Sequence, residues 1–209
     1  MRALVHYRVE GSAARLTLDS PDNRNALSTT LVNQLLQGLS DAAEESGVHA
    51  VVLGHTGGTF CAGADLSEAS RRDPGHIVLD QARELTELLR AILELPTPVI
   101  AAVNGHVRAG GLGLIGACDI AVAGPNSTFA LPEARIGVAP SIISLTLLPK
   151  LTARAAGRYF LTGEKFGAAE AASIGLITIA DDDVEATVNA LTADIGHASK
   201  QGLAASKAL

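Results

Sequence analysis

The chain has 209 residues, of which 47% are hydrophobic and only 3% aromatic, so Ala, Val, Leu and Ile must pack most of its core. This length and composition suit one compact domain. Sixteen basic against 22 acidic residues give a net charge of −6, and no basic stripe offers a surface for duplex nucleic acid. No apolar stretch reaches the roughly 20 residues of a membrane helix, and the segment 1–20 lacks the apolar block of a signal peptide. We expect a cytoplasmic protein without a nucleic-acid or membrane partner.

The first quarter of the chain predicts a hairpin, a helix and a buried strand. Alternating apolar and polar residues indicate strands over 4–9 and 14–18. A helix is expected to follow Ser28, which suits its N-cap, and to end at Gly47. The short apolar segment 49–54 then indicates a buried strand.

The rest of the chain predicts further strands and helices in alternation. A glycine-rich loop leads into a long helix near 77–95, and a buried strand at 99–103 is followed by a second glycine-rich segment and a short helix to about Cys118. The later elements expected are strands at 119–123 and 128–131, a turn at 132–137, and helices at 141–148, 152–161, 168–174 and 184–195. The unit strand, strand, helix recurs, which indicates a layered α/β spiral rather than a single doubly wound sheet.

Two glycine-rich loops, Thr59–Leu66 and Gly105–Gly113, each follow a buried strand. Small residues let a ligand approach the backbone, and a helix that begins in such a loop leaves N–H groups unpaired. Two such groups aimed at one carbonyl oxygen would stabilise the negative charge of an enolate. The same loops would also suit tight turns that pack helix against sheet, and the loops alone do not decide between these interpretations.

Several motifs carry a resemblance to a known family. The segments FCAGADL, PVIAAVNGHVRAGGLGLIGACDIAVA and FALPEARIGVAP, supported by SPDNRNALS and LTGEKFGAAEAASIGLI, occur in one order along the chain. Over about Leu16 to Ile179 the chain resembles the enoyl-CoA hydratase/isomerase (crotonase) superfamily. The resemblance implies an α/β fold, a crotonase-type spiral of repeated β-β-α units with a helical C-terminal region. The core is then expected over 1–195, and 196–209 would be the start of an incomplete C-terminal helical region.

The resemblance also implies a reaction site. It places two oxyanion donors at the backbone N–H groups of Ala64 and Gly110, and it matches Glu133 with the family's second catalytic glutamate. Partial burial would raise the pKa of Glu133 and suit it to carry protons near neutral pH, whereas the residue taken alone would be a surface glutamate in a turn. The positions expected along the substrate are Arg24, Ala26, Ala62, Asp65, Leu66, Gly113 and Ser141. Of these, Arg24 would meet a phosphate or simply lie in solvent, and Asp65 also suits a helix cap.

One position departs from the pattern of the dual-glutamate hydratases that the chain resembles. Their first glutamate, three residues after the oxyanion glycine, corresponds here to Gly113. Either Glu133 then handles both the proton and the water, or Ser141, His106 or Arg108 assists. A single glutamate is also what the isomerases of the family use. The motif with Gly113 looks closer to bacterial hydratases of branched, glutaconyl-type substrates such as 3-methylglutaconyl-CoA.

Other signals in the sequence point to weaker alternatives. The run Gly111–Gly116 fits GxGxxG, but the helix after it is too short for a usual dinucleotide-binding βαβ unit. The six histidines form no closely spaced metal-binding pair. Cys61 is better explained as a small buried hydrophobe than as a nucleophile, and no G-x-S-x-G elbow of a serine hydrolase occurs.

The expected function is that of an enoyl-CoA hydratase, a lyase of fatty acid metabolism that adds water across the 2,3 double bond of an acyl-CoA thioester. The alternatives are a Δ3,Δ2-enoyl-CoA isomerase and a non-catalytic acyl-CoA-binding homologue. No metal or redox cofactor is expected, since coenzyme A enters as part of the substrate. The resemblance further implies a homotrimer or a dimer of trimers.

Overall fold

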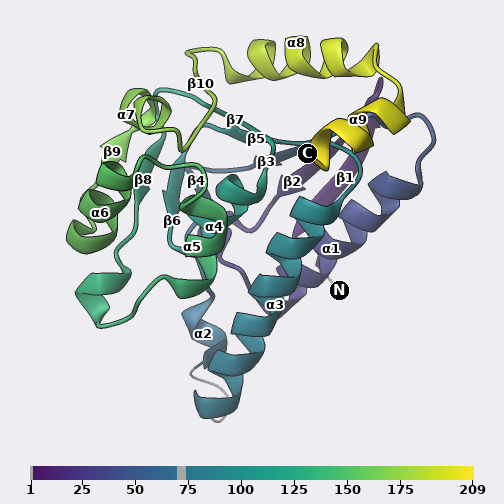
Figure 1. The fold of residues 1–209 in the computed structure, drawn as a ribbon. Helices are drawn as coiled ribbons and strands as arrows, with labels where there is room; N and C mark the ends of the chain where they lie inside the picture. The colour runs from purple at the N-terminus through teal and green to yellow at the C-terminus, as the bar shows by residue number, and fades with distance from the viewer. Residues whose placement is uncertain (1, 70–73) are drawn as a thin grey trace.

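The computed structural model describes residues 2–69 and 74–209, with the side chains of 66, 69 and 74–78 left aside. Its strands form two sheets (Figure 1). The larger sheet has the order β1-β2-β3-β5-β7-β10, with β1 (Val5–Glu10), β2 (Ala13–Leu18), β3 (Ala50–His55), β5 (Val99–Val103), β7 (Ile120–Ala123) and β10 (Ile179–Ala180). The smaller has the order β4-β6-β8-β9, with β4 (Thr59–Cys61), β6 (His106–Arg108), β8 (Thr128–Ala130) and β9 (Phe166–Gly167).

The larger sheet is covered on both faces, as expected for strands that pair in parallel. Only β1 runs antiparallel to its neighbour; the pairs from β2 to β10 are parallel. Successive residues of a strand point to opposite faces, so Val51 and Leu53 join the main apolar cluster while Ala50 and Val52 join a second one. The main cluster holds residues of α1 (Thr29–Glu44), α3 (Pro74–Glu94) and α4 (Gly110–Ala117), and the second holds residues of α8 (Val184–Gly196). Figure 1 shows α8 on the side of the sheet opposite α4.

The chain winds as a spiral, in which each turn adds one strand to each sheet. The sequence β3, β4, α3 is followed by β5, β6, α4 and then by β7, β8 and a helical stretch. This confirms the predicted spiral of β-β-α units. The remaining short elements are α2 (Leu66–Ala69), α5 (Ser141–Leu147), α6 (Ala153–Thr162), α7 (Ala168–Ser173), α9 (Lys200–Lys207) and the 3-10 turns η1 (Pro21–Asn23) and η2 (Glu133–Ile136).

Two details of the predicted elements differ from the structure. Ser28 does cap α1, since its Oγ accepts a hydrogen bond from Leu31 N at 3.3 Å, but the helix ends at Glu44, before Gly47. The segments holding β4 and β6 were expected to be glycine-rich loops, and each contains a strand of three residues. These strands pair in the smaller sheet and carry the loops that follow them.

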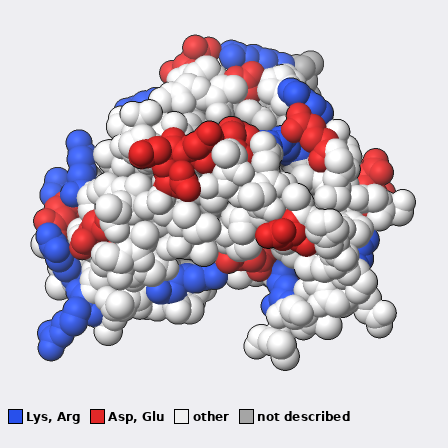
Figure 2. Space-filling model, turned by 90° about the horizontal axis from the view of Figure 1, so that it is seen from above, with Lys and Arg blue, Asp and Glu red and all other residues white. Residues whose placement is uncertain are grey.

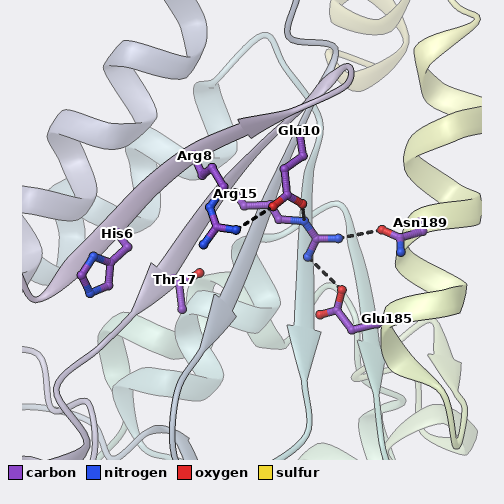
Figure 3. Close-up of a pocket in the computed structure, with 7 residues that line it drawn as sticks. All are labelled: His6, Arg8, Glu10, Arg15, Thr17, Glu185 and Asn189. Atoms are coloured by element: carbon purple, nitrogen blue, oxygen red, sulfur yellow. Dashed lines mark hydrogen bonds and ion pairs between the residues drawn. The ribbon is translucent and has the colours of Figure 1, made fainter.

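Ion pairs and a hydrogen bond connect α8 to the N-terminal hairpin of β1 and β2. Arg15 of β2 pairs with Glu10 at 2.7 Å and with Glu185 at 2.9 Å, and it donates to Oδ1 of Asn189 at 2.6 Å (Figure 3). Arg8 also reaches Glu10, at 3.1 Å. The basic and acidic side chains of this group therefore pair with one another.

Figure 2 views the molecule from above, and acidic side chains gather in the middle of that face. Among the described residues, no helix is both long and apolar enough to cross a membrane.

Candidate active site

Three loops emerge together from one edge of the smaller sheet. The strands β4, β6 and β8 pair in parallel, with Arg108 opposite Ala130 in the register of β6 and β8. Because parallel strands end at the same edge, the residues after them lie near one another, where ligands bind in open α/β sheets. Ala64 follows β4, Gly110 follows β6 and Glu133 follows β8.

The first two loops touch directly at Gly63 and Gly110. A Cβ atom at Gly63 would lie 3.3 Å from the amide nitrogen of Gly110 and 2.9 Å from the Cβ of Ala109. Gly63 also has φ +92, a conformation in which side chains are strained. Glycine is therefore required at this contact, which brings the peptide joining Gly63 to Ala64 beside the first amide of α4.

The backbone N–H groups of Ala64 and Gly110 have no hydrogen-bond acceptor among the described residues of the chain. Gly110 is the first residue of α4, so its amide lies in the turn that leaves N–H groups unpaired. Ala109, before it, has φ 47 and ψ −119, an unusual backbone conformation for alanine. The two amides expected to be oxyanion donors thus lie at the junction of the two loops, unpaired within the described part of the chain.

A segment from the start of the chain supports the first loop. Leu27 N donates to Gly63 O at 2.8 Å, and Asp65 N donates to Leu27 O at 3.3 Å. Leu27 and Ala64 form a parallel bridge. This pairing fixes the backbone on both sides of the Ala64 amide.

Asn25, which the sequence analysis did not single out, anchors that supporting segment. Its fully buried side chain accepts from Ser20 N at 2.7 Å and donates to the carbonyl oxygens of Thr56 at 3.1 Å and Thr59 at 2.7 Å. It thereby ties the 20–25 turn to the start of β4. The only sequence signal for this role of Asn25 was its place in a turn-forming segment. Asn tolerates the positive φ of 53 that it has here.

Glu133 begins η2 and is half-buried. Its Oε2 atom is buried and has no hydrogen-bond partner among the described residues. Burial raises the pKa of this carboxyl above its ordinary value. The end of β8, which leads to Glu133, is hydrogen-bonded to the loop before Gly110, because Ala109 N donates to Ala130 O at 3.4 Å. A carboxyl group with these properties suits proton transfer.

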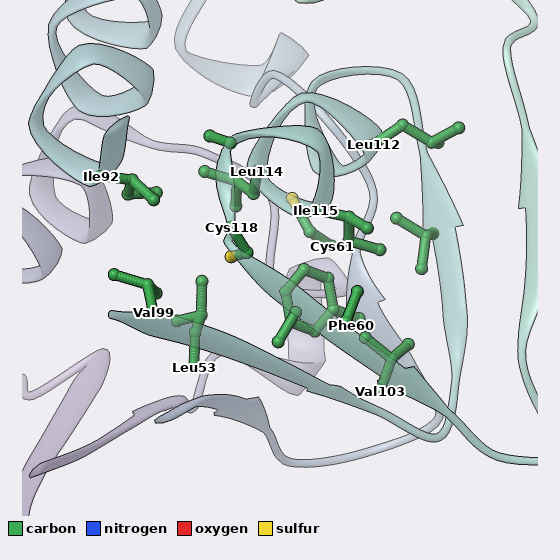
Figure 4. Close-up of a cluster of buried hydrophobic side chains, with 14 of the residues drawn as sticks. Leu53, Phe60, Cys61, Ile92, Val99, Val103, Leu112, Leu114, Ile115 and Cys118 are labelled. Atoms are coloured by element: carbon green, nitrogen blue, oxygen red, sulfur yellow. The ribbon is translucent and has the colours of Figure 1, made fainter. Parts of the chain in front are cut away.

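Gly113 lies one helical turn beyond Gly110 in α4, whose residues are all buried. A Cβ atom at Gly113 would lie 2.5 Å from Cγ2 of Ile143 and 3.4 Å from Cδ1 of Leu89. The GxGxxG run also lies within this helix, and Gly111 fits against the carbonyl oxygen of Cys61. Figure 4 shows Leu112, Leu114 and Ile115 of α4 among the buried apolar side chains. These glycines are therefore packing contacts between helices and strands.

The remaining predicted substrate positions are spread around the loops. Ala26 is buried, Ala62 is half-buried and Arg24 is exposed in a left-handed conformation. Leu66 begins α2, and its side chain lies outside the described part of the structure. Ser141 begins α5 and is exposed.

Asp65 acts as a helix cap. Its Oδ1 accepts from Ser67 N at 2.9 Å and from Ser67 Oγ at 2.7 Å, and its Oδ2 accepts from Asn23 Nδ2 at 3.1 Å. The first of these bonds is the one expected of an N-cap residue for α2. The cap interpretation of the sequence therefore fits the geometry.

Two of the three side chains proposed as helpers of Glu133, Arg108 and His106, are hydrogen-bonded to Thr128. Arg108 donates to the carbonyl oxygen of Thr128 at 2.6 Å, and His106 Nδ1 is bonded to the Thr128 hydroxyl at 2.9 Å. Cys61 is fully buried, and burial raises its thiol pKa to about 12, so it stays a neutral thiol. No group of His, Cys, Asp and Glu in the described parts of the chain is arranged to hold a metal ion.

Comparisons with known proteins identify the family to which the chain belongs. A family model described as enoyl-CoA hydratase/isomerase matches residues 8–209. The chain belongs to the enoyl-CoA hydratase/isomerase family. A solved structure of an enoyl-CoA hydratase from Mycobacterium avium is 62% identical, with a TM-score of 0.92 over 100% of this chain and 82% of that one. The fold is thus the crotonase fold that the sequence predicted.

Two curated relatives are more distant. The enoyl-CoA hydratase domain-containing protein 3, mitochondrial, of Danio rerio is 32% identical over 169 residues, which cover 81% of this chain. The 2,3-dehydroadipyl-CoA hydratase of Escherichia coli is 35% identical over 164 residues, which cover 78% of this chain. The chain spans 58% and 63% of the lengths of these two relatives.

Proposed function

We propose that the chain is the core of an enoyl-CoA hydratase that works through an enolate and uses one carboxyl group. The observation that carries the proposal is the common edge of β4, β6 and β8. This edge brings Glu133 and two amides that are unpaired among the described residues to one end of a sheet. Membership of the family supports a hydratase-type reaction on an acyl-CoA thioester. The coenzyme A portion arrives with the substrate, and the mechanism calls on no other cofactor.

In the proposed reaction, the thioester carbonyl oxygen accepts hydrogen bonds from the amides of Ala64 and Gly110. Glu133 takes a proton from a water molecule while the water oxygen bonds to carbon 3, and the electrons of the double bond move to give the enolate. The two amides stabilise the charge on the enolate oxygen. Protonated Glu133 then delivers the same proton to carbon 2, so one water molecule is added in total.

The environment of Glu133 supports this double role. Burial raises the pKa of the Glu133 carboxyl, so it holds a proton more readily than an exposed carboxyl does. Its buried Oε2 has no hydrogen-bond partner in the described residues, so no neighbouring group restrains that oxygen.

A second candidate, a Δ3,Δ2-enoyl-CoA isomerase, is favoured by one observation. Gly113 supplies no side chain, and its neighbours Ile143 and Leu89 are apolar. A single carboxyl can move a proton between two carbons without activating water. Separate incubation with 2-enoyl-CoA and 3-enoyl-CoA distinguishes the two: a hydratase consumes the conjugated thioester and forms a hydroxyacyl product, whereas an isomerase converts the 3-enoyl form into the conjugated one.

We further propose that the chain works as a homotrimer or a dimer of trimers. Exposed apolar side chains near η2 and α5 support a covered surface there: Ile136, Val138, Leu145 and Leu148 are all more than half exposed. Such a patch on one protomer suits contact with another. The mass of the protein in solution, by light scattering, tests this, and a monomer at working concentration would exclude it.

The substitution that tests the proposed function is Glu133→Gln. We expect turnover of enoyl-CoA substrates to fall at least about 100-fold, with acyl-CoA binding nearly unchanged because the amide has almost the same shape. The matched control is Glu94→Gln, since Glu94 is the exposed last residue of α3 and its carboxylate pairs with Arg90 at 2.7 Å. Full turnover by the Glu133→Gln variant would exclude Glu133 as the base. A wild-type protein that binds acyl-CoA tightly but turns over no enoyl-CoA would instead indicate a non-catalytic homologue.

A further inference from the structure

The first turn of α4 has two glycines on nearly the same face, and each is covered by an aliphatic side chain. Gly110 and Gly113 are three residues apart, which places them one above the other on a helix. A Cβ atom at Gly110 would lie 3.1 Å from Leu27 Cδ1, and one at Gly113 would lie 2.5 Å from Ile143 Cγ2. The second distance is too short for real atoms, so Ile143 already occupies that space.

Ile143 is held firmly in this place. It is only 3% exposed, and a β-branched side chain in a helix has one strongly preferred rotamer. One turn further along α5, Thr146 Oγ1 donates to Gly113 O at 3.1 Å. Gly116 meets the backbone of the same residue, because a Cβ there would lie 2.9 Å from Thr146 O. The two helices are therefore locked together, and Ile143 cannot withdraw by a small shift of α5.

The space that Ile143 fills is chemically important because of its direction. Side chains of an α-helix point toward the N-terminus of the helix. A side chain at position 113 would accordingly extend toward the Gly110 amide, one of the two proposed enolate donors. A carboxyl group there would lie near the Gly110 amide, on a different element from Glu133.

We propose that Ile143 determines how many carboxyl groups the site can hold. Its γ2 methyl group fills the place of a side chain at position 113 and so limits the site to one carboxyl group, that of Glu133. The inference rests on the proposed function, because it concerns the chemistry of the same site. Gly113 and Ile143 act as a complementary pair. The absent side chain of the first makes room for the second, and both must change before a second acid can enter.

The packing part is tested by thermal unfolding of alanine and valine variants. Gly113→Ala should lower the Tm, and Ile143→Ala should rescue it, so that the double variant melts about 4 °C or more above the sum of the two single shifts. Ile143→Val is the matched control, since valine keeps the Cγ2 methyl and should give no rescue. Gly116→Ala is a second control, because its contact is with a backbone oxygen that Ile143→Ala does not move. Shifts that simply add, or equal rescue by valine, would overturn the proposal.

The catalytic part compares G113E/I143A with G113Q/I143A, which differ only in acid against amide. We expect the acid variant to hydrate a 2-enoyl-CoA at least about tenfold faster and to gain a second ionisation in its pH profile. Equal rates and profiles would mean that Ile143 only packs, and the proposal would be wrong. It would also be wrong if G113E/I143A failed to fold while G113A/I143A folded, since something other than Ile143 would then exclude the acid.

These outcomes are separable from failure of the proposed function. The melting experiments need no substrate, and they report on the pair of residues alone. If they succeed while wild type turns over no enoyl-CoA, the proposed hydratase function fails and the packing relation remains. If wild type is active but the melting shifts add, the inference about Ile143 fails and the function remains.

Discussion

Gly63 and Gly110 meet so closely that a Cβ on Gly63 would lie 3.3 Å from the Gly110 amide nitrogen. The two residues are 47 positions apart (110 minus 63) and belong to loops after different strands of the smaller sheet. Their contact brings the proposed oxyanion donors Ala64 and Gly110 together. The spacing of the two amides therefore depends on a glycine that donates nothing to the substrate.

Substitution Gly63→Ala should damage catalysis more than binding. The added methyl would strain a residue at φ +92 and push against Ala109 and the Gly110 amide, which would displace one of the two donors. Loss of a single oxyanion donor costs about 100-fold to 1,000-fold in kcat, so we expect a fall of at least about 100-fold with a smaller change in KM. Steady-state kinetics with an enoyl-CoA substrate measure this.

The matched control is Gly11→Ala, in the hairpin turn. Gly11 also has a positive φ, +60, but a Cβ there meets nothing within 4 Å. It therefore shares the backbone strain without the contact. Equal kcat for Gly63→Ala and wild type would show that the loops tolerate a wider spacing than the proposed geometry allows.

Asn25→Ala should destabilise the fold and loosen the first loop. The change leaves Ser20 N and the carbonyl oxygens of Thr56 and Thr59 without their present partner, and each unsatisfied buried group costs about 1–3 kcal/mol. We expect the free energy of unfolding to fall by at least about 2 kcal/mol in urea titrations. Asn33→Ala, at an exposed position of α1, should change it little. Similar values for the two variants would refute the anchoring role of Asn25.

The raised pKa of Glu133 has a consequence for stability with a definite sign. Because burial raises the pKa of the folded state above the unfolded value, the ionised carboxylate disfavours folding. Relative to Glu133→Gln, wild type should keep its stability below the ordinary pKa of the carboxyl and lose it as pH rises through the folded pKa. Urea titrations of both proteins between about pH 4 and pH 8 measure the difference. A difference that stays constant, or that grows in favour of wild type as pH rises, would contradict the burial of this group.

Five of the six strands of the larger sheet and the main helices were predictable because their signals are local, whereas β10, with only two residues, was not predicted. The apolar segment 99–103 is a strand in the structure with the predicted bounds, and Ser28 caps its helix as predicted. The strands β4 and β6 have three residues each, too few for a period to be visible, and they lie in glycine-rich segments. Their pairing is long-range, so only the folded structure reveals the smaller sheet.

The candidate site likewise has residues that the sequence motifs indicated and relations that only the folded structure shows. Ala64, Gly110 and Glu133 came from motifs that resemble a family, and the structure places all three after strands of one sheet. The role of Asn25 depends on carbonyl groups more than 30 residues away, and the filling of Gly113 depends on a residue of α5. Neither relation leaves a pattern in the local sequence.

The central claim is that two amides stabilise an enolate while Glu133 removes and returns its proton. A saturated acyl-CoA, which has no 2,3 double bond, tests this claim most directly. A saturated acyl-CoA incubated with the protein in heavy water can exchange hydrogen at carbon 2 only through the enolate, and mass spectrometry detects the deuterium gained. We predict exchange with wild type and almost none with Glu133→Gln, at concentrations where both bind the ligand. Binding by wild type with no exchange at carbon 2, or equal exchange by the two proteins, would contradict the account.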